Sequence, residues 1–524
     1  MRYKFKTTPY AHQVEAIKKL VSNGFGGALL MDPRTGKTKT TIDYLSILAQ
    51  AGKVDCVLIV CPSRVMDVWV EEFHTHCSLM ANVLVWDSKT RRKGFLPPVS
   101  AAFDLTVVIV NYEAFGTPGK RLASGRRSKA SGRFKHRTLI KKWVGKHNAA
   151  IVLDEAHKIK SPSGRASNMV VSMAGDFRYK VILTGTPVTK AKRIHDLYMQ
   201  WSFLNPARLE ELDIRTAAEM KEFTGVWISC NGFPQWLRPK EKNVEKLRAA
   251  IHKDAYAVKR SECFDLPPRD VEIIKVPLSR VSAKAYDDLA TKMVAEVQEW
   301  RELNEEKKEL QREKASKPKL EKLEREIHTV EASIALVQRL RLAQVTSGIA
   351  TTDDDKLIRI GREKLDTLAD LLEDIFEKEE KVVIAARFKA DLNSITRLVR
   401  SMKVPAFELR GGMKREDTTA NIRRFKTYDG PAAFIMQPQA GSLGIDLSSA
   451  SRMIWYSLTP SWVDYTQSCD RIALSRNSTT FTYLLAEGTV DEVQYEELEQ
   501  DGSVARMITD NPEVFLRNRP VRTR

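Results

Sequence analysis

The stretch GALLMDPRTGKTKTTIDYL, residues 27–45, is the strongest local signal in this 524-residue chain. A short apolar run ends at Met31, a loop containing Gly36 follows, and the apolar spacing after residue 40 predicts a helix. A buried strand, a tight loop and a helix N-terminus would direct backbone N–H groups toward a phosphate chain. The stretch therefore predicts a nucleotide phosphate site in which Lys37 contacts the β- and γ-phosphates and Thr38 binds Mg²⁺.

The loop departs from the usual phosphate-loop pattern at one end. Met31 stands where GxxxxGK[ST] has its first glycine, so a chance GKT at the start of a helix is the alternative. In the phosphate interpretation, the loop residues around the phosphates are Arg34, Thr35, Gly36, Lys37 and Thr38.

A second chemical signal follows another apolar run. The sequence LDEAHK, residues 153–158, places Asp154 and Glu155 directly after the run at 151–153. Ligands of open α/β sheets bind outside the carboxyl ends of the strands, which would bring both carboxylates beside the phosphate loop. Asp154 is then the expected Mg²⁺ partner, and Glu155 is expected to orient or activate the attacking water. A solvated turn is the structural alternative, and the combination with the GKT loop favours catalysis.

Short apolar runs rich in β-branched residues recur along the chain, with helical stretches between them. Strands of this kind are buried on both faces and indicate parallel α/β sheets. The runs form two separate series, so we expect two α/β lobes. The first series lies at 27–31, 57–60, 107–110, 151–153 and 181–183, and the second at 382–386, 432–436, 453–455 and 481–486.

The region between the two series predicts a different architecture. Apolar residues recur at three- and four-residue spacings from Tyr286 and again after Pro318, which predicts two long amphipathic helices turning near 316–318. An antiparallel hairpin is the first interpretation and a dimerising coiled coil the second. The expected parts are a first lobe at 1–280 with a helical part at about 205–255, a helical hairpin at 281–360, a second lobe at 361–500 and a C-terminal tail at 501–524.

Residues 116–146 are rich in Gly, Ser, Lys and Arg, and we expect much of this segment to be a mobile basic loop. Such a loop could follow nucleic-acid phosphates. A solvated surface loop without a role is the alternative.

The composition limits the classes of function. The chain has 85 Lys and Arg against 67 Asp and Glu, and its formal charge of +18 suits DNA, RNA, an anionic membrane or an acidic protein. It contains no apolar run long enough to span a bilayer and no secretory signal pattern, so we expect it to remain inside the cell. Six cysteines form no CxxC pair, which argues against a disulfide framework and a zinc site: Cys56, Cys61, Cys77, Cys230, Cys263 and Cys469.

The order of motifs resembles superfamily 2 helicases of the Swi/Snf type, from Tyr10 to about Glu492. DEAHKIKSP, residues 154–162, is similar to the family's extended DEAH motif, and PYAHQ, residues 9–13, resembles its adenine-reading segment. By this resemblance Gln13 contacts the base. The resemblance implies that a CPS turn touches the nucleic-acid backbone, through Pro62, Ser63 and Arg64, and that LTGTP couples hydrolysis to strand contact, through Thr184, Gly185 and Thr186. His157 of the DEAH motif is placed to sense the γ-phosphate and take part in this coupling, with a packed surface histidine as the alternative.

The C-terminal half carries the resemblance further. QAGSLGIDLSSA, residues 439–450, looks like the family's GGxGxNL motif, in which Asp446 replaces the usual Asn. The glycines of this motif would permit close backbone approach to phosphates. The resemblance assigns Gly441 and Ser442 to nucleic acid, and Gly444 and Asp446 to the nucleotide.

The last motif, QSCDRIALSRN at 467–477, departs from the family pattern of two arginines three residues apart. The first is Arg471, but Leu474 occupies the second position. Arginine fingers stabilise charge on the transferred phosphoryl group and can contribute roughly 10³-fold or more in rate. We hypothesise that Arg476 substitutes through a two-residue shift, with a plain surface role as the alternative.

The resemblance implies two RecA-like lobes that use ATP and Mg²⁺ to drive movement on duplex or branched DNA, with RNA as a second option, in replication, recombination or repair. A strand-separating DNA or RNA helicase is one alternative. A nucleic-acid-binding scaffold with a decayed ATPase is another, motivated by Met31, Leu474 and Asp446. By family analogy, the compact build suggests a bacterial or bacteriophage member acting in the cytoplasm of a bacterial or infected cell.

Overall fold

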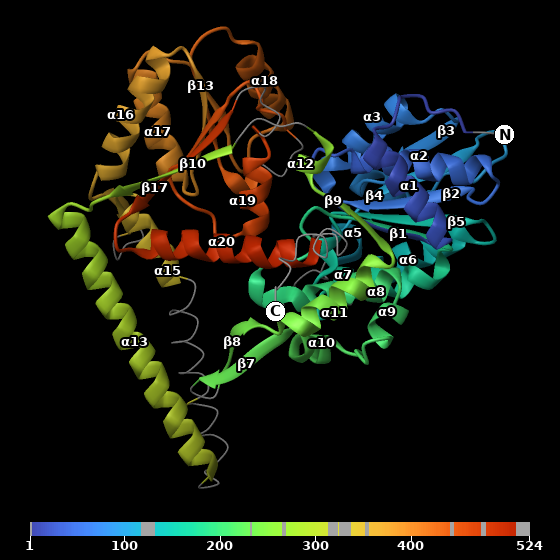
Figure 1. The fold of residues 1–524 in the computed structure, drawn as a ribbon, viewed down its shortest axis with the longest axis horizontal. Helices are drawn as coiled ribbons and strands as arrows, with labels where there is room; N and C mark the ends of the chain where they lie inside the picture. The colour runs from blue at the N-terminus through green and yellow to red at the C-terminus, as the bar shows by residue number, and fades with distance from the viewer. Residues whose placement is uncertain are drawn as a thin grey trace, which may run out of the picture. The chain divides into compact units, whose positions relative to one another are not determined.

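The computed structural model describes residues 3–116, 131–230, 233–264, 269–312, 323, 337–351, 356–440, 445–472 and 478–509. The chain divides into two compact units. The first comprises Met1–Asp265 and Gln500–Arg524, and the second comprises Leu266–Glu499. Each unit is built on its own parallel sheet (Figure 1).

The first unit contains a seven-stranded sheet in which all neighbouring strands are parallel. The carboxyl ends of the strands therefore lie at one edge of the sheet, and the loops after them gather there. The strand order is β3 (Ala81–Val85), β4 (Leu105–Asn111), β2 (Cys56–Cys61), β5 (Ala149–Asp154), β6 (Tyr179–Leu183), β1 (Gly26–Met31) and β9 (Ala255–Val258).

Helices cover both faces of this sheet (Figure 1). Leu29 and Met31 of β1 pack with one group of helices, whereas Ala28 and Leu30 pack with the other, because successive side chains of a strand point to opposite faces. The first group is α1 (Ala11–Asn23), α2 (Lys37–Gln50) and α3 (Met66–His76), and the second includes α6 (Ser131–Val144), α7 (Arg165–Met173), α8 (Leu197–Leu204) and α11 (Glu241–His252).

The second unit repeats this plan with a six-stranded parallel sheet. Its order is β10 (Arg269–Val276), β17 (Thr479–Ala486), β16 (Arg452–Trp455), β13 (Lys381–Ala385), β15 (Ala432–Met436) and β14 (Ala406–Leu409). One face packs against α16 (Glu363–Glu377) and α17 (Lys389–Ser401), and the other against α18 (Arg415–Thr427), α19 (Trp462–Cys469) and α20 (Val490–Thr509).

The predicted fold class is confirmed: the protein is α/β with two parallel sheets, and each of the nine predicted apolar runs coincides with a strand, apart from Ala386, which follows β13. The boundary between the lobes differs from the expectation. β10 pairs in parallel with β17 and so belongs to the second sheet, which places the division at 265/266 instead of 280. Residues 281–360 likewise lie within the second unit.

The expected basic loop at 116–146 is wrong for its second half, since residues 131–144 form α6. Ile140, Trp143 and Val144 are buried against the sheet core. Their three- and four-residue spacing is that of an amphipathic helix, which the surrounding basic residues obscured in the sequence. Residues 117–130 lie outside the described part of the chain.

The expected helical part at 205–255 contains α9 (Ala207–Glu210), α10 (Ala217–Thr224) and α11, but also an antiparallel hairpin of β7 (Gly225–Cys230) and β8 (Phe233–Pro239). In the middle region α13 (Arg280–Arg312) confirms the first long helix. The turn at 316–318 and most of the second helix lie outside the described residues, as does 510–524 of the expected tail.

The remaining elements are short. Among the described helices, none is both long and apolar enough to cross a lipid bilayer. The remaining short elements are α4 (Ser88–Lys93), α5 (Glu113–Gly116), α12 (Arg260–Cys263), α15 (Val337–Thr346), β11 (Ile349–Thr351), β12 (Leu357–Arg359) and the 3₁₀ turns η1 (Ser63–Val65), η2 (Ala156–Ile159), η3 (Ala174–Asp176), η4 (Ala191–Asp196) and η5 (Pro438–Ala440).

Candidate functional site

The loop between β1 and α2 is a tight turn held by its own backbone. The carbonyl of Asp32 accepts hydrogen bonds from the backbone N–H of Thr35 at 3.4 Å and from its hydroxyl at 2.7 Å. Arg34 has φ 66° and Gly36 has φ 85°, so two residues of the loop adopt the left-handed conformation. Strained backbone of this kind is common at ligand sites, and it turns the chain into the N-terminus of α2.

The start of α1 supports this loop from outside. The side-chain amide of Gln13 donates to the Thr35 carbonyl at 3.2 Å, and its oxygen accepts from the Tyr10 N–H at 3.0 Å. A ring nitrogen of His12 lies 2.8 Å from the same Thr35 carbonyl. Gln13 is 2% exposed, so both ends of its amide are engaged with backbone at the loop.

Lys37 is the first residue of α2 and lies against the loop. Its ammonium group donates to the carbonyls of Met31 at 2.8 Å and Asp32 at 3.1 Å. Its charge opposes the rise that burial causes in the pKa of Asp154, and it contributes to the lowered pKa of Glu155. The structure therefore brings together the lysine and the two carboxylates that the sequence singled out.

Asp154 ends β5, and two aromatic residues hold it in place. The indole N–H of Trp69 donates to Asp154 Oδ2 at 3.0 Å, and the hydroxyl of Tyr112 donates to the Asp154 carbonyl at 2.8 Å. Burial and the neighbouring charge of Glu155 raise the pKa of Asp154, while the Trp69 hydrogen bond opposes the rise. Sequence reasoning missed both aromatic residues. The available signal was the position of Tyr112 directly after β4, matching that of the acidic pair after β5.

Glu155 adopts a left-handed conformation with φ 54°. Its carboxylate lies 3.3 Å from Nδ1 of His157. Burial would raise the pKa of Glu155, but the hydrogen bond and charge of His157, with Lys37 and Lys158, bring it below its ordinary value. The ionised form that a water-orienting base requires is thereby favoured.

His157 connects the acidic pair to the loop after β6. Its Nδ1 lies 3.5 Å from the Thr184 hydroxyl, which accepts the backbone N–H of Thr186 at 3.0 Å. A β-carbon on Gly185 would lie 3.0 Å from Pro33 Cδ, so this segment packs directly on the loop after β1. β6 lies between β5 and β1 in the sheet, which explains why these segments meet.

The predicted nucleic-acid turn follows β2, which neighbours β5. Pro62 precedes η1, and Ser63 is exposed at its start. The side chain of Arg64 lies outside the described residues. The turn continues without a break into α3, which carries Trp69.

Only part of the site predicted for the second unit lies within the described residues. Arg471 is 7% exposed, and its guanidinium donates to the Ile445 carbonyl at 3.4 Å. Asp446 forms an ion pair with Lys426 at 2.7 Å and accepts the Ser448 N–H at 3.1 Å, which accounts for a carboxylate in place of the family's Asn. The predicted residues that lie outside the described part are Gly441, Ser442, Gly444, Leu474 and Arg476.

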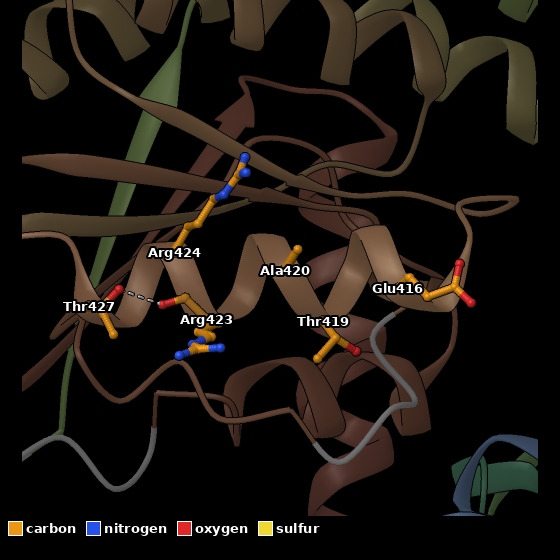
Figure 2. Close-up of a pocket in the computed structure, with 6 residues that line it drawn as sticks. All are labelled: Glu416, Thr419, Ala420, Arg423, Arg424 and Thr427. Atoms are coloured by element: carbon orange, nitrogen blue, oxygen red, sulfur yellow. Dashed lines mark hydrogen bonds between the residues drawn. The ribbon is translucent and has the colours of Figure 1, made fainter.

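An open depression of about 620 Å³ follows α18 in the second unit. Arg423 and Arg424 leave the helix in different directions and do not converge on one point (Figure 2). We therefore assign no ligand to it. Its lining is Glu416, Thr419, Ala420, Arg423, Arg424 and Thr427.

The donors in the first unit suit a magnesium nucleotide. The Thr38 hydroxyl and the Asp154 carboxylate are hard oxygen ligands of the type that Mg²⁺ prefers. The N-terminus of the 14-residue α2 and the Lys37 ammonium suit anionic phosphates. Within the described residues, no cluster of three His, Cys, Asp or Glu side chains forms a further metal site.

Two protein families match this chain. Residues 11–332 match the SNF2-related domain, and residues 363–474 match the helicase conserved C-terminal domain. The first match covers more than half of the sequence, and the two matches together include every strand of both parallel sheets except β17.

Curated relatives show the same pattern at low identity. A Xenopus tropicalis SWI/SNF-related regulator of chromatin, subfamily A, containing DEAD/H box 1, is 23% identical over 87% of this chain and 46% of its own length. The human DNA excision repair protein ERCC-6-like is 23% identical over 95% of this chain and 41% of its own length. The chain thus spans less than half of either relative.

Among solved structures, the Sulfolobus solfataricus SWI2/SNF2 ATPase core in complex with dsDNA is 17% identical. The alignment covers 97% of this chain and 98% of that one, with a TM-score of 0.38.

Proposed function

Because the chain belongs to the SNF2-related domain family, we propose that it is an ATP-driven motor that moves along double-stranded DNA. The observation that carries this proposal is the meeting of Lys37 with Asp154 and Glu155 at one edge of the first sheet. A cation for phosphates, a metal ligand and an ionised base are the parts that phosphoryl transfer requires.

The proposed chemistry assigns one task to each residue of this edge. Lys37 and the first N–H groups of α2 bind the β- and γ-phosphates, and Thr38 and Asp154 hold the metal. Mg²⁺, when bound, neutralises charge on the phosphate oxygens. The ionised carboxylate of Glu155 orients the attacking water or accepts its proton.

The coupling between hydrolysis and DNA would pass through His157. Its contacts with Glu155 and Thr184 join the base to the segment after β6, which packs on the phosphate loop. A change at the γ-phosphate therefore has a short path to Thr184, Gly185 and Thr186.

DNA as the partner rests on the family, the formal charge of +18 and the named roles of relatives in chromatin regulation and DNA repair. We propose duplex or branched DNA as the preferred form, contacted through Pro62 to Arg64. We propose that the chain acts in replication, recombination or repair, in the cytoplasm of a bacterial or infected cell.

The second unit carries the candidate arginine fingers. We propose Arg471 for this role and Arg476 for the position that Leu474 leaves without an arginine. Loss of an arginine finger lowers the rate by about 10³-fold or more. Full DNA-stimulated hydrolysis in Arg476→Ala would contradict the second assignment.

The test is ATP hydrolysis by the purified chain without nucleic acid and with single-stranded DNA, duplex DNA, branched DNA or RNA. Stimulation by duplex or branched DNA that disappears in Lys37→Ala and Glu155→Gln is expected. Stimulation by single strands or RNA alone would instead indicate a strand-separating helicase. Absence of hydrolysis under every condition would indicate a binding scaffold with a decayed ATPase.

A further inference from the structure

Two buried aromatic residues, Trp69 and Tyr112, donate hydrogen bonds to the proposed metal ligand Asp154. They come from the segments that follow β2 and β4. Trp69 is 1% exposed and donates its indole N–H to the Asp154 carboxylate at 3.0 Å. Tyr112 is 6% exposed and donates its hydroxyl to the backbone carbonyl of the same residue at 2.8 Å. One contact fixes the carboxylate and the other fixes the strand end that carries it.

The two donors come from segments next to the proposed DNA contacts. Trp69 lies in the first turn of α3, and α3 follows directly on η1 and the Pro62 turn. Tyr112 directly follows β4, which pairs along its length with β2, the strand that leads into that turn. A displacement of the turn would therefore reach Trp69 through less than two turns of helix.

We propose that Trp69 and Tyr112 are positioning residues that transmit DNA binding at the 62–64 turn to the metal-binding carboxylate of Asp154. This inference rests on the proposed function, because it presumes that DNA contacts the turn. It supplies a physical route for DNA stimulation within the first lobe.

The strength of the route follows from the chemistry of the contact. A hydrogen bond to a carboxylate is charge-assisted, and it restricts rotation of the carboxylate. Partners that orient a metal ligand typically change metal affinity or activity by about 10- to 100-fold when they are removed. A shift of α3 that lengthens or shortens the Trp69 contact would thus change how well Asp154 holds the metal.

The test compares Trp69→Phe with a matched control, Trp201→Phe. Trp201 lies in α8 of the same lobe and is fully buried, and among the described residues its indole nitrogen has no hydrogen-bond partner. Both substitutions keep an aromatic ring and remove an indole N–H. Tyr112→Phe is the second variant, and it removes a single oxygen and leaves the core packing intact.

Two readouts separate positioning from mere packing. The first is the enhancement of fluorescent ADP binding by Mg²⁺, taken as the ratio of dissociation constants in EDTA and in Mg²⁺. The second is the ratio of ATP hydrolysis with and without duplex DNA. DNA affinity without nucleotide and the midpoint of urea unfolding serve as checks of the fold.

Trp69→Phe is expected to reduce the Mg²⁺ enhancement about 10-fold and to remove most of the DNA stimulation, with DNA affinity within twofold of the unsubstituted protein. Tyr112→Phe should produce a smaller loss in the same direction, and Trp201→Phe should leave both ratios unchanged. Unchanged ratios in Trp69→Phe and Tyr112→Phe, or equal losses in Trp201→Phe, would overturn the inference. Absence of DNA stimulation in the unsubstituted protein would instead overturn the proposed function, and the transmission with it.

Discussion

The side-chain amide of Gln13 covers Gly36 so closely that a β-carbon on Gly36 would lie 2.0 Å from Gln13 Nε2. Gly36 also has φ 85°, a conformation that side-chain-bearing residues rarely adopt. The loop therefore requires glycine at this position both for space and for backbone geometry.

Gly36→Ala is expected to weaken ATP binding at least tenfold, because the loop must move away from Gln13 to admit the methyl group. Gly52→Ala is the control, since Gly52 has φ 64° but nothing within 4 Å of its β-position. Both variants should lose about 1 kcal/mol of stability, because alanine is strained in the left-handed conformation. Only Gly36→Ala should also lose affinity for ATP. Isothermal titration calorimetry measures the binding. Equal affinities in the two variants would refute the account of this loop.

Gln13→Ala tests what the buried amide does. Both ends of the side-chain amide form hydrogen bonds with the backbone. We therefore expect the variant to free the Thr35 carbonyl from its hydrogen bond with Gln13 and to weaken ATP and GTP binding by similar factors. Competition binding with the two nucleotides measures this. A loss confined to ATP would instead assign Gln13 to the adenine, as the family resemblance implies.

Glu155→Gln should separate binding from chemistry. The amide keeps the shape of the side chain but cannot accept the proton, so hydrolysis should fall by about 10²-fold or more while ATP still binds. Single-turnover hydrolysis alongside equilibrium ATP binding distinguishes the two effects. Asp104→Asn, at an exposed carboxylate before β4, is the control. Near-normal turnover in Glu155→Gln would remove Glu155 from the proposed role.

Asp391 in the second lobe predicts a pH dependence of stability. Its carboxylate is 1% exposed and accepts hydroxyl hydrogen bonds from Ser347 and Ser457, and burial raises its pKa to about 7. Because the folded-state pKa lies above the ordinary value, the stabilising contribution of the protonated form is lost as pH rises toward 7. Asp391→Asn does not titrate, so its free energy of unfolding relative to the natural chain should rise by about 2 kcal/mol between pH 5 and 8.

Urea unfolding at the two pH values measures this difference. The control is Asp366→Asn, at an exposed position of α16. A difference between Asp391→Asn and the natural chain that stays constant with pH would show that Asp391 is ionised throughout this range.

The sequence predicted the central strands because they are buried on both faces and read as continuous apolar runs. β2 and β4 are such strands. β10 escaped prediction because its first residues are exposed and charged, and its partner β17 lies about two hundred residues away along the chain. Edge strands of this kind are defined by pairing, which local composition does not encode.

Lys37, Asp154 and Glu155 could be singled out from the sequence because each belongs to a local motif at a strand end. Trp69 and Tyr112 were missed because their links to Asp154 span 85 and 42 residues, respectively. The carboxylate of Asp446 also became interpretable only when its partner Lys426 was seen on α18. Tertiary contacts, in each case, supplied what residue spacing could not.

The proposed motor must use ATP to move along duplex DNA. The most direct measurement is displacement of a third strand annealed to a DNA duplex, followed on a native gel with and without ATP. We expect ATP-dependent displacement by the natural chain, none by Glu155→Gln, and an intact duplex afterwards. Failure to displace the third strand despite DNA-stimulated hydrolysis, or separation of the duplex strands themselves, would contradict the proposal.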